Sequence, residues 1–207
     1  MRSNVDSDTV NYLNARKGTV TRRAVWMIGK NRDTGVDESA GFWNDVVNAD
    51  ITVISGQTGL SETRTYVGLG TLIDLDDINL VSDLTIQTVR ARMSQIDDTV
   101  NQTFRLYDAR NARIEYHYVL LDIDTNLPVG VPVPHFVGFV NKAPIVRPKV
   151  GASGGISATA VSRTRELTVT NPAKKSDETQ KLRSGDRFRQ YSSTAGDWPI
   201  WWGENKG

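Results

Sequence analysis

The chain has 207 residues, of which 38% are apolar and 24% are charged, and its 25 Lys and Arg against 24 Asp and Glu give a net charge of +1. This composition excludes a disordered chain, which would have fewer apolar residues or a strong net charge. No apolar run approaches the roughly 20 residues of a membrane-spanning helix, and the opening Met-Arg-Ser-Asn-Val-Asp lacks the apolar stretch of a secretory signal. Because there is no Cys, disulfide scaffolds, thiolate zinc sites and iron–sulfur clusters are excluded as well.

The first predicted element is a short helix over residues 7–17, where apolar side chains recur at helical spacing. Ser7 or Asp8 is placed to cap its N-terminal end. Gly18 suits the position just after the last turn, because a left-handed backbone there favours glycine.

Strands are predicted through the rest of the first half. Residues 21–29 alternate Val25 and Met27 on one face with Ala24 and Trp26 on the other, and because both sets are apolar, both faces should be buried. Further strands are expected at 51–55, 63–73 and 84–93. Glycines should bend the second of these, and a change of apolar phase within the third predicts a one-residue bulge.

One internal helix is predicted near the middle of the chain. Apolar residues recur every four positions from Ile96 to Phe104, and Ser94 with Asp97 three residues later resembles a capping box. The helix should end near Tyr107, followed by a turn.

Beyond this helix the pattern is again that of strands. A turn over 108–111 leads into a strongly alternating strand at 112–122. Further strands are expected at 131–140, at 143–150 paired with 156–161, and at 167–170. Together these elements predict a mainly β protein, a barrel or sandwich, with one internal helix and a short N-terminal helix.

The C-terminal region differs from the rest in composition. Residues 171–190 are polar and basic without periodicity, which predicts an extended arm, and Trp198, Trp201 and Trp202 follow it. Each indole can bury on the order of 200 Å², so they either pack on the chain's own sheet, anchor a neighbouring subunit or form a platform for carbohydrate. We therefore divide the chain into a barrel-like domain, residues 1–170, and a basic arm with a Trp-rich C-terminal anchor, residues 171–207.

The charges are balanced overall but not locally. Residues 72–98 carry six Asp against two Arg, and residues 163–189 carry eight basic against four acidic residues. These segments are either two solvated faces with weak ion pairs, or a basic segment of one subunit that docks on the acidic face of another. A nucleic-acid groove is disfavoured because the whole chain is nearly neutral.

Two motifs associated with catalysis or metal binding fail on their surroundings. Residues 151–155 match G-x-S-x-G, but the nucleophile elbow needs a following helix, and residues 156–160 alternate like a strand. Residues 122–126 resemble the start of an EF-hand loop, but Leu127 stands where the turn glycine belongs and Val133 where the bidentate glutamate belongs.

The remaining candidates for chemistry are isolated. Adjacent carboxylates occur at 76–77 and 97–98, but neighbouring side chains point apart and do not converge by themselves. His117 and His135 are the only two histidines and make a weak metal site without cysteine. A hydrolase dyad assembled from distant strands stays open, but the residues predict no catalytic site, no cofactor and no metal.

Several short segments occur in a characteristic order: Ser-Gln-Ile-Asp at 94–97, Tyr-Asp-Ala-Arg-Asn-Ala at 107–112, Pro-Val-Gly at 128–130, Phe-Val-Gly-Phe-Val at 136–140, Arg-Ser-Gly-Asp-Arg-Phe at 183–188, and a Trp-Gly tail. In this order the chain resembles the tail-tip proteins of tailed bacteriophages, a family of baseplate hub, tail assembly and distal tail proteins with relatives in gene transfer agents. The likeness covers most of the chain and is weakest over 34–62.

The resemblance implies a β-barrel related to tail-tube subunits, assembled around the tail channel as a trimeric hub, which we favour, or a hexameric ring. Its partners would be further copies of itself, the tail tube protein, the tape measure, and a central fibre or other tail-tip proteins. The protein would be made in the host bacterial cytoplasm and located in the virion, with DNA only as cargo in the channel and no membrane. Some relatives bind an iron–sulfur cluster through C-terminal cysteines, and this chain has none.

We therefore expect a structural virion component that is not an enzyme, whose arm grips another subunit. The expected interface residues are Arg183, Asp186, Arg187, Phe188, Trp198, Trp201 and Trp202. The alternative is a carbohydrate- or receptor-binding β module that uses the tryptophan cluster.

Overall fold

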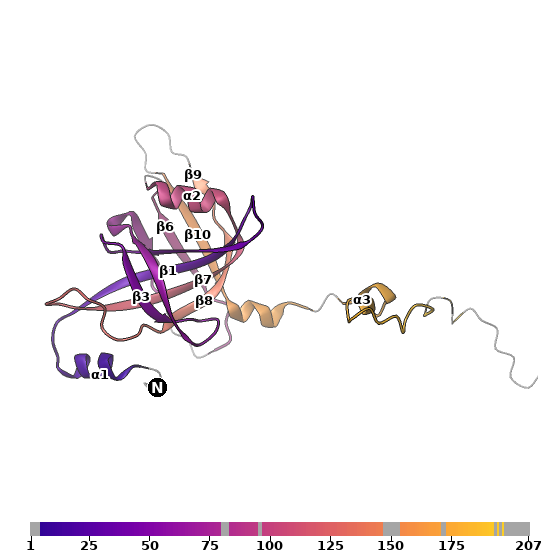
Figure 1. Cartoon of the computed structure of the whole chain (residues 1–207), viewed down its shortest axis with the longest axis horizontal. Coiled ribbons are helices and arrows are strands. Elements are labelled where there is room, and N and C mark those ends of the chain that lie inside the picture. Colours follow the sequence, from indigo (N-terminus) through magenta and orange to yellow (C-terminus); the bar gives the residue numbers. More distant parts are fainter. Residues whose placement is uncertain are drawn as a thin grey trace, which may run out of the picture. The chain divides into compact units, whose positions relative to one another are not determined.

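The computed structural model describes residues 5–79, 83–94, 97–146, 154–170, 173–192, 194 and 196. The chain separates into two compact units, residues 1–167 and residues 168–207, which we call the β unit and the C-terminal unit. Figure 1 shows the strands gathered in the β unit.

The described part of the β unit is built from ten strands and a few short helices. The strands are β1 (Thr19–Asn31), β2 (Asp37–Trp43), β3 (Ala49–Ile54), β4 (Ser61–Gly68), β5 (Ile73–Leu75), β6 (Thr88–Met93), β7 (Tyr107–Asp122), β8 (Pro134–Lys142), β9 (Ile145–Val146) and β10 (Gly155–Ser162). The helices are α1 (Ser7–Asn14), α2 (Asp98–Leu106), the 3-10 turns η1 (Gly70–Leu72) and η2 (Arg163–Thr168), and, in the C-terminal unit, α3 (Asp177–Lys181).

The strands form one sheet in the order β3-β4-β2-β1-β7-β8-β10-β6-β5, with β9 paired to β10. All neighbours are antiparallel except β2 and β4, which are parallel. The longest ladder joins β1 to β7 and places Val25 opposite Tyr116. The prediction of a mainly β protein is therefore confirmed.

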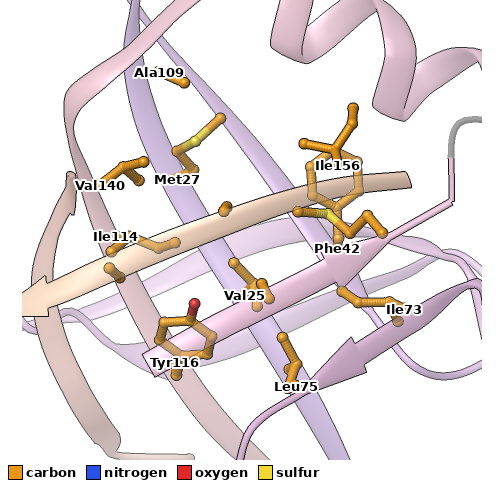
Figure 2. Close-up of a cluster of buried hydrophobic side chains, with 14 of the residues drawn as sticks. Val25, Met27, Phe42, Ile73, Leu75, Ala109, Ile114, Tyr116, Val140 and Ile156 are labelled. Atoms are coloured by element: carbon orange, nitrogen blue, oxygen red, sulfur yellow. The ribbon is translucent and has the colours of Figure 1, made fainter. Parts of the chain in front are cut away.

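The main core lies on the concave side of this sheet. Val25 on β1 and Phe42 on β2 belong to the same buried cluster as Ile73 on β5 and Ile156 on β10, although these strands lie far apart in the sheet order. The sheet therefore curls around the cluster, as Figure 2 shows. Val100 and Phe104 of α2 also belong to this cluster, so the helix packs on it.

A second core lies on the other face of β1 and β7. The hairpin formed by β3 and β4 contributes Ile51, Val53 and Tyr66 to a cluster with Ala24 and Val119. Both faces of β1 are therefore buried, as the alternation of apolar residues predicts.

The two predicted helices exist, but other residues cap them. Asp6, not Ser7 or Asp8, accepts the capping hydrogen bond of α1, and Arg16 takes the left-handed position (φ 52°) that we assigned to Gly18. In α2 the cap is Asp97, whose carboxylate accepts from the backbone N–H groups of residues 99 and 100. A carboxylate one residue before each helix reaches these donors directly.

Two predictions of strand irregularity were wrong. Leu84, in the segment read as a bulged strand, is 77% exposed, and β6 begins only at Thr88, so the phase change marks the start of the strand. The turn predicted at 108–111 does not break β7, which begins at Tyr107. Asn111 takes a left-handed backbone (φ 62°), and a register shift opposite residues 28–30 of β1 absorbs the irregularity.

Other elements differ as well. β2 was missed because its first residues, Asp-Glu-Ser-Ala, show no alternation of apolar and polar side chains, and only its last three residues are buried. Residues 163–168 are a 3-10 turn, not the strand expected at 167–170. The strand over 63–73 is interrupted near Gly68 and Gly70, as predicted. The basic arm is not wholly extended, because α3 forms after Ser176, whose hydroxyl accepts from the Thr179 N–H.

Candidate functional site

The C-terminal unit contains the described interface candidates, which all lie in the turns that follow the short helix α3. Ion pairs fix this arrangement locally: Lys181 Nζ lies 2.7 Å from Glu178 Oε1 and 3.4 Å from Asp177 Oδ2, and Arg187 Nη2 lies 3.1 Å from the same Asp177 oxygen. Desolvation raises the pKa of Asp177, but the hydrogen bonds from Arg187 and Lys181 outweigh it, so that the pKa is lowered overall. The carboxylate therefore stays charged and holds helix and turns together.

Asp186 is held in a second local network. Gln180 Nε2 donates to Asp186 Oδ2 at 2.7 Å, and the Phe188 N–H donates to Oδ1 at 2.9 Å. These bonds lower the pKa of Asp186. Two of the expected interface residues, Asp186 and Arg187, thus have partners within their own unit.

Beside these pairs lies a hollow of about 460 Å³ whose lining is rich in cations. We call it the cationic hollow, and its charged and aromatic lining is Lys174, Lys175, Arg183, Phe188 and Arg189. Phe188 is 87% exposed, and Leu182, six residues earlier in the same unit, is 86% exposed. The hollow combines positive charge with one exposed aromatic ring, the chemistry of a surface for an acidic, partly apolar partner.

The structure thus places Arg183 and Phe188 in the lining of one hollow and gives Asp186 and Arg187 partners within their own unit. Trp198, Trp201 and Trp202 lie outside the described residues. Lys174, Lys175 and Arg189 were not among the predicted interface residues, although their charges contribute to the basic segment noted in the sequence.

The β unit contains a buried ion cluster that the sequence did not reveal. Arg64 on β4 and Glu115 on β7 are both almost fully buried, and Arg64 Nη1 donates to Glu115 Oε2 at 2.8 Å. The Gly56 N–H donates to the same oxygen at 3.0 Å, and Glu62 accepts from Arg64 Nη2 at 3.0 Å. The guanidinium also lies 5.0 Å from the ring centre of Trp26.

This cluster fastens the β3–β4 hairpin to the outer face of the sheet. Burial alone would lower the pKa of Arg64, but the hydrogen bond and the charge of Glu115 raise it overall. A buried ion pair of this kind holds two elements in one register. The only sequence signal is the alternation of Glu115 and His117 with apolar residues along β7.

His117 is a neutral, structural histidine. Its side chain is buried, and Nε2 lies 3.0 Å from the Ile54 carbonyl oxygen, which can only accept, so Nε2 carries the proton. Burial lowers the pKa of His117 to about 4. His135 instead packs edge-on against Tyr118 with ring centres 4.6 Å apart. The two histidines therefore have separate packing roles.

Three of the six aspartates in the acidic segment pair with arginines of the same sheet. Arg92 Nη1 lies 2.9 Å from Asp74 and 3.0 Å from Asp76, and Arg23 Nη2 lies 2.6 Å from Asp77. Asp97 serves as the cap of α2. The acidic segment expected from composition is thus partly engaged in ion pairs and a helix cap.

The β unit also has a small cleft of about 210 Å³ between β7, β8 and η2. Glu115 and Arg113 of β7, Phe139 of β8 and the exposed ion pair of Arg163 with Glu166 (3.0 Å) line it. Its charges are balanced, and it is smaller than the roughly 300–1,000 Å³ of most small-molecule sites.

The two rejected motifs lie in turns and strands. Gly155 opens β10, so a strand follows the G-x-S-x-G segment, whose first three residues lie outside the described part. Asp122 accepts from the backbone N–H groups of Asp124 (2.7 Å) and Thr125 (3.3 Å), which makes residues 122–126 a turn closed by its own side chain.

Within the described ranges, no group of three His, Asp or Glu side chains is placed to hold a metal ion. None of the helices in those ranges is long and apolar enough to cross a membrane. No protein-family model and no curated protein matches this chain in sequence.

Proposed function

We propose that this protein is a structural component of a bacteriophage tail tip or baseplate, which forms a hub or ring and connects the tail tube to distal fibre or tip proteins. The observation that carries the proposal is the C-terminal unit. It is a compact unit of its own and exposes Leu182, Phe188 and Tyr191, of which Phe188 lines the cationic hollow. Large exposed apolar side chains grouped with arginine are typical of protein interfaces.

The β unit supports the same function. Its sheet curls around one core, and the sheet order ends at β3 and β5, each with one edge unpaired among the described strands. The unpaired backbone groups of an open sheet edge can pair with a strand of a neighbouring chain, unless the edge is protected. A curved, rigid sheet with a separate docking unit suits a subunit whose task is assembly geometry, and the family resemblance of the sequence points the same way.

In this proposal the subunits form a trimer, or alternatively a hexameric ring, around the tail channel, and the segment 174–189 reaches a neighbouring polypeptide. Trp198, Trp201 and Trp202 then lock the contact. The protein is a virion constituent and performs no catalysis.

Native mass measurement of the purified full-length chain tests this function. We expect trimers or hexamers, and we expect deletion of residues 196–207 to leave a folded monomer, as judged by circular dichroism and unfolding. A full-length chain that is monomeric at every concentration contradicts the proposal. A truncated chain that unfolds shows that the tail packs on its own sheet. Glycan-array binding by the monomer would favour a carbohydrate-binding module instead.

A further inference from the structure

The C-terminal unit gathers cations that its own carboxylates do not match. Among its described residues the ion pairs use Lys181 and Arg187, which engage Asp177 and Glu178. By contrast, Lys174, Lys175 and Arg189 have no carboxylate within 4.0 Å among the residues that the structure describes, and all three line the cationic hollow. The unmatched positive charge is therefore concentrated at one concave place.

Apolar side chains stand next to this charge. Phe188 lines the hollow and is almost fully exposed, and α3 has no buried residue. A segment of this kind buries too little apolar surface to offset the conformational entropy lost on ordering. Contact with a partner that covers Phe188 would supply that missing burial.

From these observations we infer that the cationic hollow binds an acidic segment of a different polypeptide, one with an apolar side chain next to its carboxylates. The inference rests on the proposed function and names the chemistry of the neighbour that the C-terminal unit grips. The carboxylates meet Lys174, Lys175 and Arg189, and the apolar side chain packs on Phe188. Arg183 completes the cationic lining.

A second copy of this chain is the less suitable partner. Three aspartates of its acidic segment already have partners, because Asp74 and Asp76 pair with Arg92 and Asp77 pairs with Arg23. Docking on these three carboxylates would replace existing ion pairs. A polypeptide with unmatched carboxylates gains more from the same contact.

Nucleic acid is also the less suitable partner. Glu178 is exposed within the same unit, at 2.7 Å from Lys181, and Asp177 and Asp186 lie close by in the chain. These carboxylates interrupt the continuous track of positive charge that an extended phosphate backbone needs. A compact hollow with one exposed aromatic ring fits a short acidic peptide segment better.

Fluorescence anisotropy with the full-length protein tests the inference. The probe is a labelled peptide of alternating Glu and Leu, and the control peptide has Gln in place of Glu. We expect the acidic peptide to bind, the Gln peptide to bind about tenfold more weakly, and high salt to reduce the difference. Equal binding of both peptides, or none, overturns the inference.

Three variants of the hollow locate the binding. The triple variant Lys174→Gln, Lys175→Gln, Arg189→Gln should weaken binding about tenfold, and Phe188→Ala should do the same while Phe188→Leu retains most of the affinity. The matched control removes three exposed, scattered cations of the β unit by Arg16→Gln, Lys30→Gln and Arg90→Gln, which alters the net charge equally. If this control weakens binding as much, the effect is one of net charge and the inference is wrong.

A competitor and a sedimentation measurement separate the remaining outcomes. Single-stranded DNA that displaces the peptide at equal charge concentration overturns the inference in favour of nucleic acid. Loss of self-association in the triple variant, measured by sedimentation, overturns it in favour of a second copy. If the wild-type chain never self-associates but binds the peptide through the hollow, the hub proposal fails while the chemistry of the hollow stands.

Discussion

The β3–β4 hairpin and the C-terminal unit use arginine in opposite ways. In the hairpin, Arg64 is buried and engages Glu115, Glu62 and the face of Trp26. In the C-terminal unit, Arg189 lines an open hollow and has no carboxylate beside it among the described residues. A matched, buried cation holds elements of one chain together, whereas an unmatched, exposed cation is available to another molecule.

The two regions also differ in their phenylalanines, one buried and one exposed, and substitution of the buried one has the largest expected effect on stability. Phe42 is 1% exposed within the main core, so Phe42→Ala leaves a cavity and should lower the free energy of unfolding by about 4 kcal/mol. Urea denaturation of the full-length chain measures this change. Phe188→Ala, the same substitution in the C-terminal unit, should change it by less than about 0.5 kcal/mol. A comparable loss at Phe188 would mean that this ring is part of a core.

Removal of Arg64 should have the next largest effect. Arg64→Met leaves the buried Glu115 carboxylate without its cation, and we expect a loss of about 3 kcal/mol in the free energy of unfolding. The double variant Arg64→Met, Glu115→Gln should recover most of this loss, because no unpaired buried charge remains. If the double variant is as unstable as the single one, the hairpin is held by packing at Arg64 and not by charge.

The histidine beneath the same hairpin predicts a pH effect. The folded-state pKa of His117 is lowered to about 4 from an ordinary value of 6.5, so the unfolded chain binds a proton that the folded chain does not take up. Stability should therefore fall as the pH falls, by about 2 kcal/mol between pH 7 and pH 5 for this group.

Urea denaturation at both pH values measures this loss, with two histidine variants as controls. His117→Gln should remove most of the dependence in that interval, and His135→Gln should retain it. An unchanged pH dependence in His117→Gln would assign the effect to other groups.

The sequence predicted those parts that depend on neighbours along the chain. Alternation identified both buried faces of β1, and spacing identified α2. The Arg64–Glu115 pair could not be predicted, because its members are 51 residues apart and meet only when the hairpin folds over β7. In the candidate site, composition located the basic segment. Which of its cations form ion pairs and which line the hollow depends on local turns, and these turns leave no periodic pattern in the sequence.

The smallest expected effect concerns the exposed aspartates. Asp77 is 81% exposed and pairs with Arg23 at 2.6 Å, so Asp77→Asn removes an exposed ion pair and should cost at most about 0.5 kcal/mol in urea denaturation. The variant also sharpens the comparison of the two regions, because it leaves the Arg23 guanidinium of the β unit without a carboxylate. If an unmatched cation suffices to bind an acidic peptide, Asp77→Asn should create a second binding site in the anisotropy assay. We expect no second site, because Arg23 still donates to the Leu75 carbonyl oxygen and lies 6.0 Å from the ring centre of Tyr118. Lys174 and Arg189 instead line an open hollow beside the exposed ring of Phe188. A second site would show that charge alone, without the hollow and its ring, accounts for binding.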